Sequence, residues 1–405
     1  IEKNIYEVGI HIADVSHYVE NKSVLDLEAY KRGTSIYLVD RVIPMLPEIL
    51  SNMVCSLRPN EEKFTFSSIF KINSNGEIIE EWYGKTVIKS NKRFSYAEAQ
   101  EIIDKKKGNI SKENSLTNKA YEVEKNLVEA IINLNEIAQQ RRKEREKQGS
   151  INFNKKEIKF KLDNKQNPIE VLFKESKEAN KLVEEFMLLA NQKVAELFKK
   201  LKKSPSVYRI HDLPDNEKLK ALKIIVKEFG YVLDISSREG TTKTLNKLLK
   251  DVQGKKEQNL IETLAIRSMS KAEYSTQNIG HYGLAFKNYT HFTSPIRRYP
   301  DIMVHRTLNE CLSNMPTKQK GIEKKCKHCS EQENNATKAE RDSIKYMQIK
   351  YMQNKKGEEF KGIISGITDW GLYVELEENK CEGMVYVKDI KEDNFVFDQT
   401  RQALK

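Results

Sequence analysis

Apolar and polar residues alternate strictly near the start of the chain. In the segment NIYEVGIHIADVSHYV the apolar side chains fall on every second position, at Tyr6, Val8, Ile10 and Ile12. This is the period of a strand with one buried face. The alternation returns over 63–72, and Asn75 and Gly76 supply a turn before a further strand that begins near Ile78. The pattern predicts β-structure in the first 90 residues.

Longer segments carry apolar residues at helical spacing instead. One amphipathic pattern runs over about 116–147, and Gly149 comes after it as a stop signal. A second runs over about 177–201. Segments 216–274 and 323–352 are also mostly helical in pattern. Because strands and helices come in separate runs, the sequence predicts an α+β fold.

The pattern changes again at Gly357. The segment that begins there, GEEFKGIISGITDWGLYVELEENKCEGMVYVKDI, has short alternating runs punctuated by glycine and rich in aromatic residues. Such runs are typical of a small β-barrel. The 405 residues therefore divide into a large domain over 1–350 and a small one over 356–405.

Charge points to the class of partner. Lysine and arginine number 70 against 59 aspartate and glutamate residues, which gives a net charge of +11 and a pI near 9.1. A basic balance of this size favours a polyanion such as RNA or DNA. A general bias toward lysine is the alternative explanation. No apolar run reaches the roughly 20 residues of a membrane span, so we expect no membrane anchor. We also expect a monomer.

The cysteines indicate the compartment. An odd number of them, five, is scattered along the chain, which is no disulfide framework and predicts a reducing, cytoplasmic environment. The pair Cys326 and Cys329 resembles half a zinc site. No second Cys or His pair stands at a matching spacing, so we expect no metal there.

The segment THFTSPIRRYPDIMVHR, residues 290–306, is the densest in candidate chemistry. Ser294 and the proline after it can start a helical turn in which Arg297 and Arg298 meet an anion. Pro300 then predicts a kink or a fresh helix start. Asp301 and the histidine four residues later can hold each other. The alternative is that these arginines bridge acidic residues at a joint in the fold.

This segment resembles the signature of the ribonuclease II / ribonuclease R (RNB) family of exoribonucleases. Further phrases resemble that family in the same order: GIHIADVSHYV, RGTSIYLVDRVIPMLPEILSNMVCSL, YRIHDLP and AERDSIKYMQ. Together they cover residues 1 to about 350. The part from Gly357 resembles the S1 domain, an OB-fold RNA-binding module. The resemblance implies an RNB-type catalytic domain with an RNA channel, followed by an S1 barrel.

The resemblance also implies roles for individual residues. Arg297, with Arg298 beside it, matches the arginine that contacts the phosphate near the scissile bond. Two aromatic and two acidic positions match residues that contact the RNA: Tyr37, Phe153, Glu340 and either Glu184 or Glu185, of which Glu185 is preferred. In the S1 domain the expected RNA contacts are Phe360, Lys361, Trp370 and Tyr373. Each of these aromatic residues could instead belong to a core, and Glu340 could be a surface charge.

The activity that the resemblance implies is processive 3′-to-5′ hydrolysis of single-stranded RNA to nucleoside 5′-monophosphates with Mg²⁺. The family's magnesium-binding aspartates lie just upstream of the IADVS phrase, so we expect them before Ile1. We therefore expect an internal fragment, without the cold-shock-type domains or the last S1 strands, that is inactive alone. Two alternatives remain: an RNA-binding protein with a related channel but no metal site, and a DNA-directed nuclease or scaffold.

Overall fold

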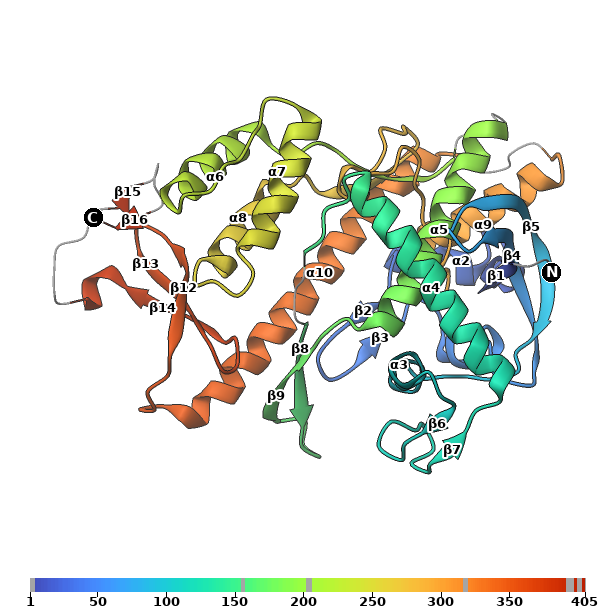
Figure 1. Ribbon diagram of the computed structural model, residues 1–405, viewed down its shortest axis with the longest axis horizontal. Helices are drawn as coiled ribbons and strands as arrows, with labels where there is room; N and C mark the ends of the chain where they lie inside the picture. The colour runs from blue at the N-terminus through green and yellow to red at the C-terminus, as the bar shows by residue number, and fades with distance from the viewer. Residues whose placement is uncertain are drawn as a thin grey trace.

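The computed structural model describes residues 4–153, 157–201, 206–315 and 320–390, together with the strand backbone at 397–398 and 403–404. Figure 1 shows an elongated body with an N-terminal sheet at one end and a smaller sheet near the other. The long helix α10 (Ile322–Met352) runs between the two ends. Helices and strands are mixed along the chain, and the strands pair antiparallel in several small sheets, which confirms the predicted α+β class.

Three antiparallel strands form the N-terminal sheet, in the order β1 (Ile5–Ala13), β4 (Glu62–Asn73) and β5 (Ile78–Lys89). The predicted alternation is confirmed, because apolar side chains of β4 on one face are fully buried: Phe66, Phe70 and Ile72. Gly76 stands in the turn between β4 and β5 with a φ of 82°, which glycine adopts without steric cost.

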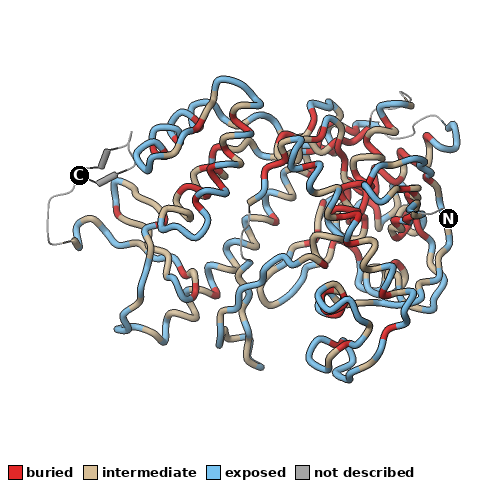
Figure 2. Tube along the Cα trace, in the orientation of Figure 1, coloured by how far each residue is buried: buried red, intermediate tan, exposed pale blue. Residues whose placement is uncertain are grey.

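The main hydrophobic core lies between this sheet and the helices α5 (Glu178–Leu201) and α9 (Tyr299–Leu312). The helix predicted over 177–201 is confirmed as α5, and ten of its side chains are buried. Figure 2 shows the buried segments concentrated at this end of the molecule. The site described below is built on this core.

Helix α4 (Lys125–Lys147) begins later than the apolar pattern predicted. The expected start near residue 116 is wrong, because strand β7 (Tyr121–Glu122) pairs with β6 (Asn109–Ile110). Local spacing could not reveal this pairing, since the partner strand lies outside the helical pattern. The end of the helix at 147 is confirmed.

A second core holds three helices together: α6 (Asn216–Glu228), α7 (Arg238–Asp251) and α8 (Gln258–Ser268). Gly230 and Gly254 lie in the connections between them. Short elements complete the large domain: α1 (Val15–Tyr18), α2 (Val24–Arg32), β2 (Ile36–Tyr37), β3 (Val42–Ile43), α3 (Tyr96–Lys105), β8 (Glu157–Leu162), β9 (Pro168–Lys174), β10 (Tyr208–His211) and β11 (Ala272–Ser275).

The C-terminal sheet consists of β12 (Gly362–Ile367), β13 (Gly371–Leu376) and β14 (Glu382–Tyr386) in antiparallel order. Strands β15 (Phe397–Asp398) and β16 (Ala403–Leu404) pair with each other. The described residues thus contain the strands expected of a barrel, but no closed barrel is formed among them. No helix in the described part of the chain is long and apolar enough to cross a bilayer.

Candidate nucleic-acid interface

A single helical turn precedes α9. The carbonyl oxygen of Ser294 accepts hydrogen bonds from the backbone N–H groups of Arg297 (3.2 Å) and Arg298 (3.1 Å). Helix α9 then starts afresh at Tyr299. Pro300 stands in its first turn, where a missing N–H leaves no helical hydrogen bond unmade. The predicted turn and the predicted fresh start at Pro300 are both confirmed.

Arg298 is engaged in an internal ion pair. Its Nε and Nη2 atoms each lie 2.9 Å from a carboxylate oxygen of Asp301, which is fully buried. Burial disfavours the charged guanidinium, but the Asp301 carboxylate outweighs burial and raises the pKa of Arg298 above its ordinary value. For Arg298 the structure therefore shows the alternative interpretation, an arginine that bridges to an acidic residue. The predicted pairing of Asp301 with His305 is wrong, because His305 Nε2 lies 2.8 Å from the carbonyl oxygen of Phe292.

Arg297 is placed differently from its neighbour. It is exposed, its Nη2 atom donates to Ser294 Oγ at 3.2 Å, and it forms no ion pair with any residue that the structure describes. Its carbonyl oxygen accepts hydrogen bonds from Ser35 N–H and Thr34 Oγ1, both at 3.0 Å. The backbone of Arg297 is thus fixed, while its charge remains available to an anion from solution.

Tyr37 and Arg297 line one cavity, although they lie far apart in the sequence. The cavity has a volume of about 430 Å³ and also takes in residues 11–13, 51, 55–57 and 293–296. Tyr37 is 46% exposed. A cavity that combines an accessible aromatic ring with an available guanidinium can hold a base and a phosphate together.

Glu340 stands behind Tyr37. One carboxylate oxygen of Glu340, on α10, accepts the backbone N–H of Tyr37 at 3.1 Å, and Ser343 accepts the N–H of Val39 at 3.1 Å. These contacts fasten the short strand β2 to the long helix. The structure therefore brings together three of the predicted residues, and Glu340 fixes the backbone that carries the aromatic ring.

The charge of Glu185 is engaged inside the fold. It is buried and forms an ion pair with Arg145, which is buried as well. A carboxylate satisfied in this way holds α4 against α5 and offers no free oxygen to a ligand in solution. Its neighbour Glu184 is exposed. The preference for Glu185 over Glu184 as the RNA contact is therefore not supported by the geometry.

Phe153 packs against the second core. Its side chain is half-buried beside the helices α6 to α8. The alternative interpretation of Phe153 as a packed hydrophobic residue fits this position. The structure does not place it in the cavity of Tyr37 and Arg297.

Comparison with known protein families decides the family. A model described as the RNB domain matches residues 1–314, most of the chain. This chain belongs to the RNB family. A model described as the S1 RNA binding domain matches residues 353–404. The Arg297 cavity therefore lies in the RNB domain, and strands β12 to β16 lie in the S1 domain.

Individual relatives agree with this assignment. Ribonuclease R 1 of Lactococcus lactis is 38% identical over 410 residues, which take in 100% of this chain and 49% of that protein. The chain spans about half the length of the curated relatives it matches. The solved structure of Mycoplasma genitalium RNase R in complex with ribose methylated single-stranded RNA is 26% identical, with a TM-score of 0.87 over 98% of this chain and 62% of that one.

A third neighbour shares the fold alone. Yeast Ssd1, described as a pseudonuclease, is 22% identical, with a TM-score of 0.75 over 99% of this chain and 48% of that chain. The RNB architecture is therefore compatible with proteins that differ in activity.

In the S1 domain the expected RNA contacts are accessible to different degrees. Trp370 is 72% exposed, and Lys361 is exposed too. Phe360 is half-buried, with Lys355 Nζ 5.7 Å from its ring. Tyr373 is half-buried and lines a slot that faces α8.

Sequence reasoning missed another aromatic residue of the S1 domain. Tyr386, at the end of β14, is 45% exposed, and Lys388 Nζ lies 5.1 Å from its ring centroid. An aromatic ring beside a lysine on a strand edge can stack with a base and attract its phosphate. The sequence VYVK, in which this tyrosine stands two positions before the lysine, could have indicated it.

His11 is a residue of the RNB cavity that the sequence did not single out. Its Nδ1 atom lies 2.6 Å from Ser67 Oγ, and burial lowers the pKa of the imidazole. At neutral pH His11 is therefore uncharged. The sequence did offer a clue to His11, because this residue lies on the predicted first strand next to the buried positions.

The acidic groups near this cavity do not form a metal site. Asp14 follows β1 and is buried, with Ser16 Oγ 2.6 Å from one carboxylate oxygen and Lys85 Nζ 2.9 Å from the other. Burial would raise the pKa of Asp14, but these two partners outweigh it and lower the pKa. Among the described residues no group of three or more His, Cys, Asp or Glu could hold a metal ion.

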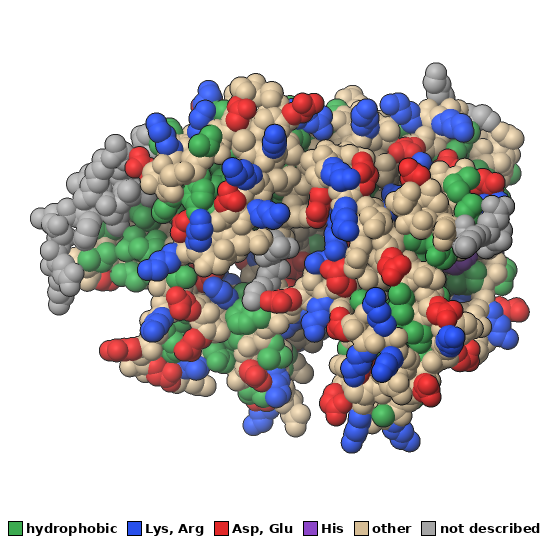
Figure 3. Space-filling model, in the orientation of Figure 1, with side chains coloured by type: hydrophobic (Ala, Val, Ile, Leu, Met, Phe, Trp, Pro, Cys, Tyr) green, Lys and Arg blue, Asp and Glu red, His purple; other side chains and the backbone are tan. Residues whose placement is uncertain are grey.

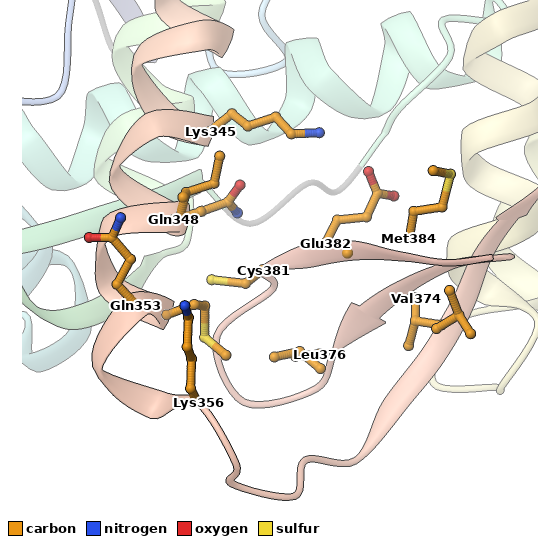
Figure 4. A pocket seen from close by; sticks show the side chains of 13 residues that line it. Lys345, Gln348, Gln353, Lys356, Val374, Leu376, Cys381, Glu382 and Met384 are labelled. Atoms are coloured by element: carbon orange, nitrogen blue, oxygen red, sulfur yellow. The ribbon is translucent and has the colours of Figure 1, made fainter. Parts of the chain in front are cut away.

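A larger, apolar cavity lies elsewhere. Its volume is about 480 Å³, and it is enclosed by the end of α10 and by β13 and β14 (Figure 4). Met352, Leu376 and Val374 are among its apolar side chains, and Lys345 and Glu382 stand at its border. It shares no residue with the Arg297 cavity, so it carries none of the predicted phosphate chemistry.

The basic charge is dispersed rather than gathered. Figure 3 shows lysine and arginine side chains spread over the visible face and mixed with acidic ones. Many lysines on the described surface are tied in ion pairs with neighbours, such as Lys71 with Glu80 and Lys220 with Glu217. Specific positions, rather than one basic patch on this face, must then decide where a polyanion binds.

Proposed function

We propose that the protein to which this chain belongs is a processive 3′-to-5′ exoribonuclease that degrades single-stranded RNA to nucleoside 5′-monophosphates. The observation that carries the proposal is the shared cavity of Tyr37 and Arg297 inside an RNB domain that an S1 domain follows. The relatives named ribonuclease R support it.

Each residue of the cavity has a role in holding RNA. Tyr37 stacks on a base without regard to its identity, because every base presents a flat face. Arg297 binds a backbone phosphate and keeps its charge throughout, since a guanidinium does not titrate near neutral pH. Glu340 fixes the backbone of Tyr37, and Asp301 neutralises Arg298 so that one arginine alone faces the ligand.

Two separate RNA contacts, one in the RNB cavity and one in the S1 domain, would retain the RNA between cuts. The RNB cavity and the exposed aromatic residues of the S1 domain lie on one chain. A strand that leaves one site is held near it by the other, which raises its effective concentration. This physical argument supports processive degradation.

Magnesium is the cofactor that the family resemblance implies, and the described residues do not fit it. Mg²⁺ requires several oxygen ligands at one point, whereas Asp14 is already engaged by Ser16 and Lys85. No catalytic step through the metal is therefore assigned to this chain. We expect polypeptide 1–405 alone to bind single-stranded RNA weakly and to release no nucleotides in magnesium.

A two-part experiment tests the proposed function. Polypeptide 1–405 and the full-length protein are incubated with 5′-labelled single-stranded RNA in magnesium, and the products are resolved at single-nucleotide length. We expect binding by both, and stepwise shortening from the 3′ end by the full-length protein alone. Internal cuts, or equal activity on DNA, would contradict the proposal. Nucleotide release by the folded 1–405 chain would contradict the separate expectation that this chain lacks the metal ligands.

A second candidate is an RNA-binding protein without catalysis. It is favoured by the lack of a metal-binding group among the described residues and by the shared fold with yeast Ssd1, a pseudonuclease. The same experiment separates the two, because this candidate predicts that the full-length protein binds RNA and leaves its length unchanged.

A further inference from the structure

His11 lies on the outer face of the N-terminal sheet. It is half-buried and stands on β1, whose alternate positions Val8 and Ile10 are buried in the main core. Successive side chains of a strand point to opposite faces of a sheet. The imidazole therefore lies on the face away from the core, and it lines the cavity of Tyr37 and Arg297.

A chain of hydroxyl groups holds one ring nitrogen of His11. The Nδ1 atom lies 2.6 Å from Ser67 Oγ on β4. Ser67 Oγ lies 2.5 Å from Thr86 Oγ1 on β5, which lies 2.7 Å from Thr65 Oγ1. Ser67 and Thr65 are fully buried. Because this network crosses from β1 through β4 to β5, the sheet itself fixes the position of the ring.

Gly9 makes room for the ring on the same strand. A Cβ atom at position 9 would overlap His11 Nε2. The imidazole thus occupies space over the backbone of Gly9 that any larger residue would fill. This close approach accounts for a glycine in the middle of a strand, where glycine otherwise weakens the structure.

The second ring nitrogen of His11 remains available. Its Nε2 atom makes no hydrogen bond with any residue that the structure describes. Burial lowers the pKa of the imidazole, so at neutral pH the ring carries one N–H group and one acceptor nitrogen. Since Ser67 can donate or accept, Nε2 is the donor in one tautomer and the acceptor in the other. A hydroxyl group suits Nε2 in both tautomers, whereas a phosphate oxygen only accepts.

Ribose supplies such a hydroxyl group. The 2′-hydroxyl distinguishes ribose from deoxyribose, and proteins use it to tell RNA from DNA. In the cavity, Arg297 supplies a charge for the phosphate and Tyr37 a stacking surface for the base. The ribose links that base to that phosphate. A neutral polar group fixed in the same cavity can therefore contact the ribose.

We propose that His11 Nε2 forms a hydrogen bond with the 2′-hydroxyl of one nucleotide in the RNB cavity and so makes the cavity selective for RNA over DNA. Ser67 and Gly9 are positioning residues, which act through the ring of His11. The inference rests on the proposed function and assigns its selectivity for ribose to one side chain.

Binding measurements on the full-length protein test this contact. The probes are a labelled RNA of about 12 nucleotides, DNA of the same sequence, and RNAs that carry 2′-deoxyribose at one nucleotide near the 3′ end, one position at a time. Affinity is measured by fluorescence anisotropy in EDTA, so that the strands are not consumed. The variants are His11→Ala, His11→Asn, Ser67→Ala and Gly9→Ala, and thermal melting confirms that each is folded. Gly9→Ala leaves every hydrogen-bonding side chain in place and carries the test if His11→Ala does not fold.

His17→Ala is the matched control. His17 is an exposed histidine of α1, six positions further along the chain, and it does not line the cavity. The same side chain is removed in His17→Ala and in His11→Ala. Any general effect of losing a histidine beside this sheet therefore appears in both variants.

We expect the parent protein to bind RNA more tightly than DNA, and one 2′-deoxy position to account for part of the difference. His11→Ala lowers the preference for RNA about threefold to tenfold, the range for one hydrogen bond. In this variant the 2′-deoxy substitution at that position no longer weakens binding.

The other variants separate the contact from its positioning. Gly9→Ala has the effect of His11→Ala although the imidazole is still present, because the added methyl group displaces the ring. Ser67→Ala gives a smaller loss of preference. His11→Asn retains part of the preference, since an amide can also bond a hydroxyl group. His17→Ala behaves like the parent protein.

Two failures are distinguishable. If the parent protein prefers RNA, and His11→Ala keeps both that preference and the full penalty of every 2′-deoxy substitution, the ribose contact lies elsewhere and the proposed function stands. If the parent protein binds the RNA and the DNA equally well, the RNA selectivity of the proposed function fails as well.

Discussion

The two regions that we propose to contact RNA are supported by the fold in opposite ways. Around Arg297, the turn is held by Asp301 and Ser294, and the residues beneath it are buried against the N-terminal sheet. In the S1 domain, Trp370 is 72% exposed and lies in the connection between β12 and β13, in a three-stranded sheet with few buried side chains. Figure 2 shows this contrast between the two ends of the chain.

The difference matches the task proposed for each region. A charge that must meet a reacting phosphate is effective only when its position is fixed in advance. An aromatic ring that tethers passing bases needs no fixed partner, because stacking tolerates sequence and small displacements. The RNB cavity therefore needs a rigidly held charge, whereas the S1 surface needs only an exposed aromatic ring.

The strongest test of this contrast is Asp301→Asn. Removing the charge leaves Arg298 buried without its counter-ion, and breaking a buried pair in this way costs about 3–5 kcal/mol. We expect the free energy of unfolding, measured by urea titration, to fall by that amount. The control is Asp369→Asn in the S1 domain, an exposed carboxylate whose loss changes stability by less than about 0.5 kcal/mol. Equal effects of the two variants would contradict the contrast.

Arg297→Ala tests the role of the fixed charge in turnover. In the full-length protein we expect the single-turnover rate of RNA hydrolysis to drop about 100- to 1000-fold, the typical loss for one preorganised electrostatic contact. RNA affinity changes much less, because other contacts remain. Arg93→Ala, at an exposed position outside the cavity, serves as the control. Near-normal cleavage by Arg297→Ala would show that the scissile phosphate lies elsewhere.

Trp370→Ala tests the tethering surface. Loss of one stacked base costs about 1–3 kcal/mol of binding, so RNA affinity of the 1–405 chain falls while its melting temperature stays within experimental error. The small effect on stability follows from the high exposure of the ring. A marked drop in melting temperature would place Trp370 in a core instead.

Tyr37→Ala has the smallest expected effect on overall rate. Fewer stacked bases in the RNB cavity let short oligonucleotides leave before the last cuts. We expect the limit product of the full-length protein to lengthen, with little change in the rate on long RNA. Gel separation of a labelled RNA digest measures it, and an unchanged end product would contradict the role given to Tyr37.

Local pattern in the sequence was enough for much of the fold. The alternation before Asp14 and the Asn75–Gly76 turn predicted the N-terminal strands, and helix α5 stands where its apolar spacing placed it. The glycine-rich, aromatic segment after Gly357 predicted the S1 strands. The alternation and the helical spacing that identify these elements repeat within about ten residues, which a single sequence displays directly.

The local pattern could not predict contacts between residues that lie far apart in the sequence. Helix α4 was predicted too long because the pairing of β6 with β7 removes its expected first residues. Glu185 was preferred over Glu184, yet its charge is engaged by Arg145 of another helix. Phe153 was matched to an RNA contact, whereas it packs beside the helices α6 to α8, which come much later in the chain.

The sequence by itself determined the family, the element types and the pair of arginines that could meet a phosphate. Only the tertiary structure decided between them, because Asp301 folds back onto Arg298 and leaves Arg297 exposed beside Tyr37. The physical reason is that the availability of a charge depends on its neighbours in space. Asp301 lies only three residues from Arg298, but Tyr37 is brought beside Arg297 by how β1, β2, α9 and α10 pack together, which the order of residues along the chain does not display.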